Sequence, residues 1–251
     1  YVVFHESEPI YTDWLKLCLG SLNKWAEWAE IVIASDNIST TTKTLLKDKF
    51  HPRFVDVPSE EWNGRRILCK LEQWGRVLKE SSPDAHVIMS DIDVVFRGNP
   101  YTAFDGLDFD LGYTSRFYPY PTPINGGLVF CKNTINVQEF VRAICHEILK
   151  PSWSEYKLIM TPNNVDWGCD QDMLNAVYKY PVFFNDKFKF VAKDVGYKYN
   201  YCPGTDVFGT AAACVLLKWA FIERIYPVLH FKGNAKDLLY EPGFGELLKC
   251  I

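Results

Sequence analysis

The stretch HVIMSDIDVVFRGNP, residues 86–100, decides the fold. Residues 86–96 are the most hydrophobic run and predict a buried strand, and Arg-Gly-Asn-Pro at 97–100 predicts a turn after it. Asp91 and Asp93 stand in the middle of this run. Because a carboxylate beside an apolar strand is costly unless a partner compensates its charge, the pair predicts a binding site where the strand ends.

Strands and helices alternate along the first 130 residues. The runs rich in β-branched and aromatic residues are 1–5, 30–36 and 53–58. The helical patterns are 11–29, a segment that Ser39 caps and that ends near 49, and 66–81. This order predicts an α/β, Rossmann-like fold, in which helices flank a mostly parallel central sheet. Ligands bind at the carboxyl ends of such strands, where Asp36 also falls.

The second half is less regular. Segments 110–116 and 126–133 predict strands, 137–150 and 170–180 predict helices, 188–204 is rich in strand signals, and 228–233 predicts a last short strand. Since repeats and linkers are missing from the sequence, we expect one domain over 1–251. Residues 1–100 would form its nucleotide-binding half, and 101–251 the half for the donor sugar and the acceptor.

Composition excludes several classes of protein. The chain has 251 residues, a net charge of −4 and a pI of about 5.8, so a basic nucleic-acid footprint is missing. The eight cysteines form no C-x-x-C pair, so they predict small buried side chains rather than a zinc site. No apolar run reaches the length of a membrane span. We expect a cytoplasmic protein, or one of the secretory or Golgi lumen if an N-terminal segment is missing.

Three D-x-D triplets occur, although seventeen aspartates would supply about one by chance. Context separates them. Asp108 and Asp110 predict a turn before a strand. The setting of Asp91 and Asp93 predicts a site for Mn²⁺ or Mg²⁺, which a few carboxylates hold and substrate phosphates complete. Such a cation neutralises a diphosphate and stabilises it as a leaving group.

A second motif lies far along the chain. His230 ends the predicted strand at 228–233 and begins the pattern H-x-x-G-x-x-K with Gly233 and Lys236. The imidazole can complete a metal site. The glycine lets the backbone approach a phosphate, and the lysine adds a positive charge.

Taken in order, these segments resemble the retaining GT-A glycosyltransferases of the family 8 type, the bacterial galactosyltransferase and glycogenin-like group. The matching segments are IVIASDNISTTTKTLL, CKLEQWGRVL, VIMSDIDVVFRGNP, INGGLVFCKN, DQDMLN and LHFKGNAK. The resemblance implies a GT-A fold, a UDP-sugar donor, Mn²⁺ as cofactor and a hydroxyl acceptor, which could belong to a glycan, a glycolipid, a protein or another molecule.

The resemblance also implies roles for individual residues. The metal ligands would be Asp91, Asp93 and His230. The donor sugar would be held by Asn125, Asp170 and Gln171, with Gln171 near the anomeric carbon. Gly233 and Lys236 would contact the diphosphate, and Tyr11 with the loop after the first strand would face the uracil. The other residues of the expected nucleotide side are Asp36, Lys70 and Ile92.

The sequence departs from the family pattern at four places. Lys70 stands where the family usually has arginine, which keeps the charge but loses the bidentate fork. The first strand is followed by HESE at 5–8 rather than by small residues and aspartate, and Asp237-Leu238 replaces Pro-Trp. Residues 151–169 form an expected insertion, which either binds the acceptor or extends the fold.

Other functions remain open at this stage. The Asp91 motif also fits the nucleophile loop of a haloacid-dehalogenase-type phosphatase, although that loop normally ends the first strand. A sugar nucleotidyltransferase would need a glycine- and arginine-rich loop near the start, which is missing. A catalytically inactive sugar-nucleotide-binding module is a third alternative. For an active enzyme we expect front-face retention, because no carboxylate stands out as a covalent nucleophile.

Overall fold

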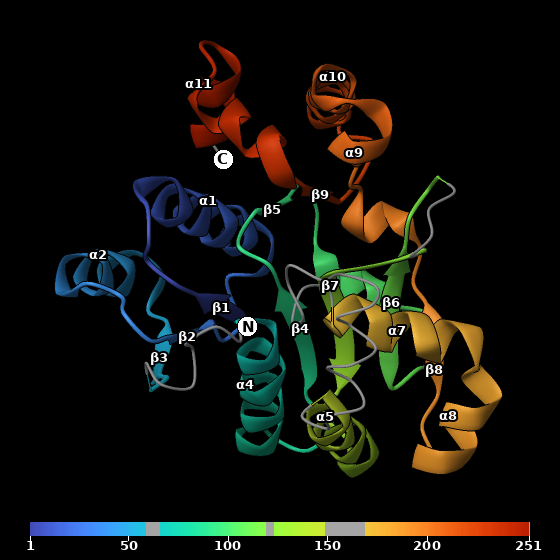
Figure 1. The fold of residues 1–251 in the computed structure, drawn as a ribbon. Helices are drawn as coiled ribbons and strands as arrows, with labels where there is room; N and C mark the ends of the chain where they lie inside the picture. Colours follow the sequence, from blue (N-terminus) through green and yellow to red (C-terminus); the bar gives the residue numbers. More distant parts are fainter. Residues whose placement is uncertain (59–65, 119–122, 149–168, 251) are drawn as a thin grey trace.

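A computed structural model describes residues 1–58, 66–118, 123–148 and 169–250. Its centre is a seven-stranded sheet in the order β3-β2-β1-β4-β7-β6-β8 (Figure 1). These strands are β1 (Val2–Phe4), β2 (Val32–Ser35), β3 (Arg53–Asp56), β4 (His86–Ser90), β6 (Leu111–Ser115), β7 (Ile124–Lys132) and β8 (Ala192–Asp194). Four neighbouring pairs are parallel, and β7 runs antiparallel to both β4 and β6. The predicted mostly parallel sheet is therefore confirmed.

The strand order creates a switch point between β1 and β4. From β1 the chain moves outward through β2 to β3, and it then returns to the other side of β1 to form β4. Connections leave these two neighbours in opposite directions, which opens a crevice at their carboxyl ends. The loop after β1 and the Asp91 motif after β4 both lie at this crevice.

Helices cover the sheet and its end. The helices are α1 (Pro9–Ala26), α2 (Thr40–Phe50), α4 (Arg66–Glu80), α5 (Ile135–Ile148), α7 (Cys169–Lys179), α8 (Pro181–Phe188), α9 (Thr205–Phe208), α10 (Thr210–Ile222) and α11 (Phe244–Lys249), with 3₁₀ helices η1 (Pro100–Phe104), η2 (Tyr197–Asn200) and η3 (Gly233–Tyr240). The C-terminal group α9–α11 lies together beyond one end of the sheet (Figure 1). None of the described helices combines the length and apolarity that a membrane span requires.

The predicted strand 86–96 is two strands, so that expectation was wrong. β4 ends at Ser90, and β5 (Val94–Phe96) pairs antiparallel with β9 (Val228–His230) in a separate two-stranded sheet. Residues 91–93 carry the chain between the two sheets, and the Asp91 amide still donates to the Gly127 carbonyl at 2.8 Å. The hydrophobicity of both pieces hid this break, because each is buried.

Alternation along β4 and β7 divides the core into two layers. Met89 and Val129 point into a cluster formed with α4, α5 and α7. Their neighbours Ile88, Leu128 and Phe130 point to the other face, into a cluster that also contains β5 and Cys18 of α1. Successive side chains of a strand face opposite sides. Both faces of these strands are thus filled, as a sheet covered on both sides requires.

Several local expectations can be compared with the structure. Ser39 caps α2 as predicted, because its hydroxyl accepts a hydrogen bond from the Thr42 amide at 3.2 Å. The apolar spacing of the predicted helix 11–29 includes Trp25, which is nevertheless 41% exposed. The segment 188–204 contains one strand, β8, followed by η2 and by Tyr201, which forms a single β-bridge, instead of several strands.

Helices α8, α10 and α11 were not predicted, and α10 is apolar enough that its sequence shows little periodicity. The cysteine prediction holds for Cys18, Cys131 and Cys202, which are buried free thiols, while Cys250 is exposed. Residues 151–168 of the expected insertion lie outside the described part of the chain. The division of the chain into two functional halves stays a prediction.

Replacing Phe130 tests the second layer of the core. Phe130 is fully buried and contacts the rings of Phe104 and Tyr199. We expect Phe130→Ala to lower the free energy of unfolding by about 3–5 kcal/mol, because a large cavity remains. Urea unfolding measures this loss. Val182→Ala, at a position that is 71% exposed, should change stability by less than about 0.5 kcal/mol. A loss below about 1 kcal/mol for Phe130→Ala would contradict the described packing.

Candidate active site

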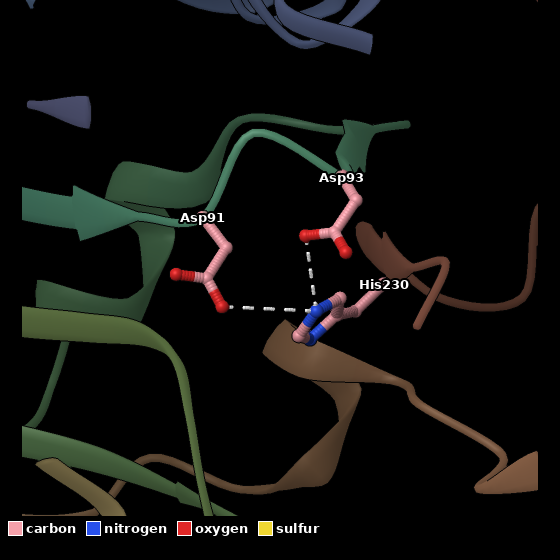
Figure 2. Close-up of side chains that lie close together, drawn as sticks. All are labelled: Asp91, Asp93 and His230. Atoms are coloured by element: carbon pink, nitrogen blue, oxygen red, sulfur yellow. Dashed lines mark ion pairs between the residues drawn. The ribbon is translucent and has the colours of Figure 1, made fainter. Parts of the chain in front are cut away.

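Three side chains from two strand ends converge beyond β4. Asp91 and Asp93 lie in the connection to β5, and His230 ends β9, whose backbone pairs with Val94. His230 Nε2 is 3.2 Å from Asp93 Oδ1 and 3.9 Å from Asp91 Oδ2 (Figure 2). The split of the predicted strand therefore shapes the candidate site. It turns both carboxylates toward a histidine from a segment almost 140 residues away.

The three side chains fit a divalent cation. One ligand atom from each lies within 4.8 Å of the others. Metal–ligand bonds of about 2.0–2.2 Å place adjacent octahedral ligands about 3 Å apart and opposite ones about 4.2 Å apart. The distances of 3.2 and 3.9 Å fall within that range. Two carboxylates and one imidazole can hold a divalent cation, and three protein ligands leave coordination positions for a substrate.

Asp93 is the more buried of the two carboxylates, with a side chain only 7% exposed against 35% for Asp91. Its Oδ2 atom pairs with Lys236 Nζ at 2.9 Å, while Oδ1 faces His230. Burial raises the pKa of Asp93, but the nearby His230 and Lys236 outweigh it and hold the pKa well below its usual range. Burial lowers the pKa of Lys236 while Asp93 raises it, and the net direction is upward. Asp93 is therefore a carboxylate at neutral pH.

Lys70 links the metal-site carboxylates to the start of α7. Its Nζ atom is 2.7 Å from Asp91 Oδ1 and 2.9 Å from Asp170 Oδ2, and it lies 5.4 Å from the centre of the Trp74 ring. Burial lowers the pKa of Lys70, and Asp170 and Asp91 raise it further than burial lowers it. Lys70, which stands where the family pattern has arginine, thus stays charged. It joins Asp91 of the predicted metal site to Asp170 of the predicted donor-sugar site.

The two glycines before the hydrophobic part of β7 permit this close packing. A Cβ atom on Gly127 would lie 2.2 Å from His230 Cε1 and 2.5 Å from Nδ1. A Cβ atom on Gly126 would lie 2.9 Å from Asp170 Oδ2. Neither distance is tolerated, so each glycine makes room for a predicted site residue.

The predicted donor-sugar residues lie next to this cluster. Asn125 is buried in β7, and its Oδ1 atom accepts from the Gly127 amide at 3.0 Å. Asp170 Oδ1 accepts from the Gln171 amide at 2.8 Å. Gln171 Oε1 accepts from Arg116 Nη2 at 3.0 Å. Arg116 was missed in the sequence because it follows a short strand and belongs to no motif.

The residues expected to bind the nucleotide make fewer polar contacts with this cluster than the predicted donor-sugar residues do. Lys236 Nζ lies 5.5 Å from the centre of the Tyr11 ring. Through Lys236, which pairs with Asp93, Tyr11 lies near the candidate metal ligands. Gly233 begins η3 with a φ of 61°, a left-handed conformation that favours glycine. Ile92 is half-buried, and its side chain packs against two apolar clusters.

Asp36 is the predicted residue least connected to the rest. It follows β2 directly, and β2 lies two strands and about 10 Å from β4. Its Oδ1 atom is 2.8 Å from His5 Nδ1. The neighbouring Glu6 accepts from the Ser39 amide and the Thr42 hydroxyl at 2.5 and 2.6 Å. Burial raises the pKa of Glu6, but these hydrogen bonds lower it further. The divergent loop after β1 is therefore fixed to the loop after β2.

The other two D-x-D triplets have different settings. Asp108 forms an exposed ion pair with Lys132, and Asp110 accepts from the Val191 amide at 2.8 Å. This agrees with the predicted turn before a strand. Asp170 and Asp172 occupy the first turn of α7, where the helix dipole favours negative charge.

Known proteins share both the sequence pattern and the fold. A family model described as nucleotide-diphospho-sugar transferase matches residues 81–221, which is more than half of the chain. The chain belongs to this family. The matched range contains Asp91, Asp93, Asn125, Asp170 and Gln171, and membership favours sugar transfer over the phosphatase alternative. The search of curated proteins found no match.

Solved glycosyltransferases have the same GT-A fold. The galactosyltransferase LgtC, solved with donor and acceptor sugar analogues, matches with a TM-score of 0.59 and 18% identity over 100% of this chain and 95% of LgtC. Mouse xyloside xylosyltransferase 1 matches with a TM-score of 0.55 and 12% identity over 93% of this chain and 96% of its own. GlyE of Streptococcus pneumoniae TIGR4 matches with a TM-score of 0.56 and 14% identity over 99% of this chain and 62% of GlyE.

Gly127→Ala tests the packing of His230. The added methyl group has to displace the imidazole ring, so we expect Mn²⁺ affinity to fall by about tenfold or more. Calorimetric titration with Mn²⁺ measures the loss. Gly75→Ala is the matched control, because its Cβ would lie 3.6 Å from Val141 Cγ1, an ordinary contact. Equal Mn²⁺ affinity in the two variants would show that Gly127 has no such role.

The ion pairs of Asp93 predict a pH dependence in the metal-free protein. A pKa below the unfolded value of about 3.9 stabilises the fold above about pH 4, and this contribution is lost as the pH falls further. With EDTA present, wild type should therefore lose about 1 kcal/mol more unfolding free energy between pH 6 and pH 3 than Asp93→Asn. Urea unfolding at both pH values measures this difference.

The exposed carboxylate of Asp108 provides the control for that experiment. Asp108→Asn should lose as much stability as wild type between pH 6 and pH 3. If Asp93→Asn and wild type lost the same amount, the ion pairs of Asp93 would not stabilise the protein.

Proposed function

We propose that the protein is a metal-dependent glycosyltransferase that moves a hexose from a UDP-sugar to an acceptor hydroxyl and retains the anomeric configuration. The observation that carries this proposal is the convergence of Asp91, Asp93 and His230, with Lys236 paired to Asp93. Family membership and the GT-A fold support sugar transfer. LgtC, a protein of similar fold, is a galactosyltransferase solved with donor and acceptor sugar analogues.

The charges of the site support a diphosphate ligand that arrives with a cation. The three carboxylates of Asp91, Asp93 and Asp170 are joined by two ammonium groups, Lys70 and Lys236. This leaves one net negative charge, which would repel a diphosphate. A divalent cation held by Asp91, Asp93 and His230 reverses the sign and would stabilise the negative charge of the leaving UDP.

Lys236 and Gly233 would bind the diphosphate, and Tyr11 would pack against the base. Lys236 comes from the same turn as His230, so the diphosphate would lie between η3 and the first turn of α1. The left-handed Gly233 leaves its backbone accessible at this turn. Asp36 and the rigid loop after β1 would border the base from the β2 side.

Asn125, Asp170 and Gln171 would orient the donor sugar. Lys70 and Arg116 hold the Asp170 carboxylate and the Gln171 carbonyl oxygen in place, which prepares both groups before a ligand arrives. Gln171 would then present its amide NH₂ to the sugar, because its carbonyl oxygen is already engaged.

The engagement of Asp170 also favours retention without a covalent intermediate. One oxygen of Asp170 pairs with Lys70 and the other accepts from the Gln171 amide, so this carboxylate is a poor nucleophile. In the proposed step the acceptor oxygen bonds to the anomeric carbon on the face that UDP leaves. The bond from that carbon to the β-phosphate oxygen breaks, and the acceptor proton passes to that oxygen.

Binding and turnover of UDP-sugars test the proposed function. We expect UDP-glucose or UDP-galactose to raise the melting temperature only when Mn²⁺ is present, and we expect slow release of UDP under the same conditions. Asp93→Ala should remove the release of UDP while the protein stays folded. Asp108→Ala is the matched control and should behave like wild type.

The outcomes separate the proposal from its alternatives. Binding of UDP with Mn²⁺ but no turnover of any UDP-sugar would favour an inactive binding module. If neither UDP nor any UDP-sugar shifted the melting temperature with Mn²⁺ present, the proposal would fail.

A further inference from the structure

We infer that Asn200 is a positioning residue for the divalent cation, because its side-chain carbonyl holds the Nδ1 proton of His230 and leaves Nε2 free to bind the metal. This inference rests on the proposed function. Asn200 was not selected from the sequence, since it lies in the irregular segment that follows β8. Asn200 belongs to η2, and His230 belongs to β9.

The contact between the two side chains is short and buried. Asn200 Oδ1 is 3.0 Å from His230 Nδ1, and each residue is only 2% exposed. When Nε2 gives its lone pair to a metal, the neutral ring carries its proton on Nδ1. A buried N–H group needs an acceptor, and Asn200 Oδ1 provides it. Partners of this kind orient metal-binding histidines and raise their basicity.

The neighbours of Asn200 fix the orientation of its amide group. Its Nδ2 atom lies 2.8 Å from Thr114 Oγ1 and 3.4 Å from the backbone carbonyl of Asn125. A backbone carbonyl only accepts hydrogen bonds, so the NH₂ group has to be on this side. The Thr114 hydroxyl donates to the same Asn125 carbonyl at 3.2 Å, which leaves its oxygen free to accept from Asn200. The carbonyl oxygen of Asn200 therefore faces the imidazole.

Asn125 is the other side chain near Nδ1, and it does not compete for the proton. Asn125 Nδ2 is 3.4 Å from His230 Nδ1, and Asn125 Oδ1 accepts from the Gly127 amide. An NH₂ group cannot accept the proton of Nδ1. Because Asn200 holds that proton, the amide of Asn125 remains available for the donor sugar.

The backbone sets the register between Asn200 and His230. Tyr201 forms a parallel bridge with Leu229, in which the Tyr201 amide donates to Val228 and the His230 amide donates to Tyr201, at 3.1 and 3.0 Å. These two hydrogen bonds hold Tyr201 beside Leu229, and these residues directly follow Asn200 and directly precede His230. Asn200 is thus fixed by its backbone neighbour and by Thr114, as a positioning residue requires.

Mn²⁺ affinity of Asn200 variants tests the inference. The EPR signal of free Mn²⁺ reports binding without turnover, at one fixed concentration of UDP. We expect Asn200→Leu, which has a similar size and no acceptor, to weaken Mn²⁺ binding by about 10- to 100-fold. Asn200→Asp keeps an acceptor for the Nδ1 proton but turns its second oxygen toward the Asn125 carbonyl, so its loss of affinity should be smaller than that of Asn200→Leu. Thr114→Val removes the anchor of the amide and should cause a smaller loss than Asn200→Leu.

A matched control separates metal positioning from folding. Asn133 is also 2% exposed, and its amide donates to the Ser81 and Ser82 carbonyls, on the opposite end of β7 from the site. Asn133→Leu should lower thermal stability but leave Mn²⁺ affinity unchanged. Wild-type affinity in folded Asn200→Leu, or in Thr114→Val should Asn200→Leu not fold, would overturn the inference and leave the proposed function intact. Failure of wild type to bind Mn²⁺ would overturn both.

Discussion

The cost of burying the Asp93 carboxylate constrains the whole site. A charge in this position has to be compensated, and its partners come from the C-terminal end of the chain. His230 reaches it because β9 pairs with β5, and Lys236 reaches it because Gly233 turns the chain directly afterwards. The two-stranded sheet therefore connects the Asp91–Asp93 segment to a distant motif. Without that sheet, the buried carboxylate would lack both of the side chains that pair with it.

The second requirement is that Asp170 and His230 pack closely against β7. Two glycines and two buried asparagine side chains meet it. Gly126 and Gly127 leave the space that Asp170 and His230 occupy. Asn125 and Asn200 then fill the polar positions around the imidazole. On the far side, Lys70 joins Asp91 to Asp170. The candidate metal ligands and the predicted donor-sugar residues are thus parts of one hydrogen-bonded network, and under the proposed function this network would couple the binding of metal and sugar nucleotide.

Much of this arrangement could be predicted from the sequence, for identifiable reasons. Strong periodicity revealed helices such as α4, and alternating strands and helices predicted the parallel half of the sheet. The Asp91 motif and the His230 turn stood out because few other roles explain such residues beside apolar strands. That the imidazole can complete a metal site with the carboxylates followed from its chemistry, and the family resemblance implied the same three ligands. The structure brings them together through the β5–β9 pair.

The remaining features depended on three-dimensional contacts that leave little local signal. The hydrophobic run 86–96 hid a change of sheet, since Ile88 and Met89 of β4 are apolar and buried like the residues of β5. The apolar sequence of α10 concealed its helical period. Arg116 and Asn200 belong to no motif, and only their distances to Gln171 and His230 identify them.

The central claim is that Asp91, Asp93 and His230 together hold the cation. Anomalous X-ray diffraction from crystals grown with Mn²⁺ and UDP tests it most directly, because the signal locates manganese without assuming its ligands. The account predicts one strong anomalous peak at bonding distance from His230 Nε2 and from carboxylate oxygens of Asp91 and Asp93. A manganese peak bound elsewhere, with these three side chains still joined only to each other and to the two lysines, would contradict it.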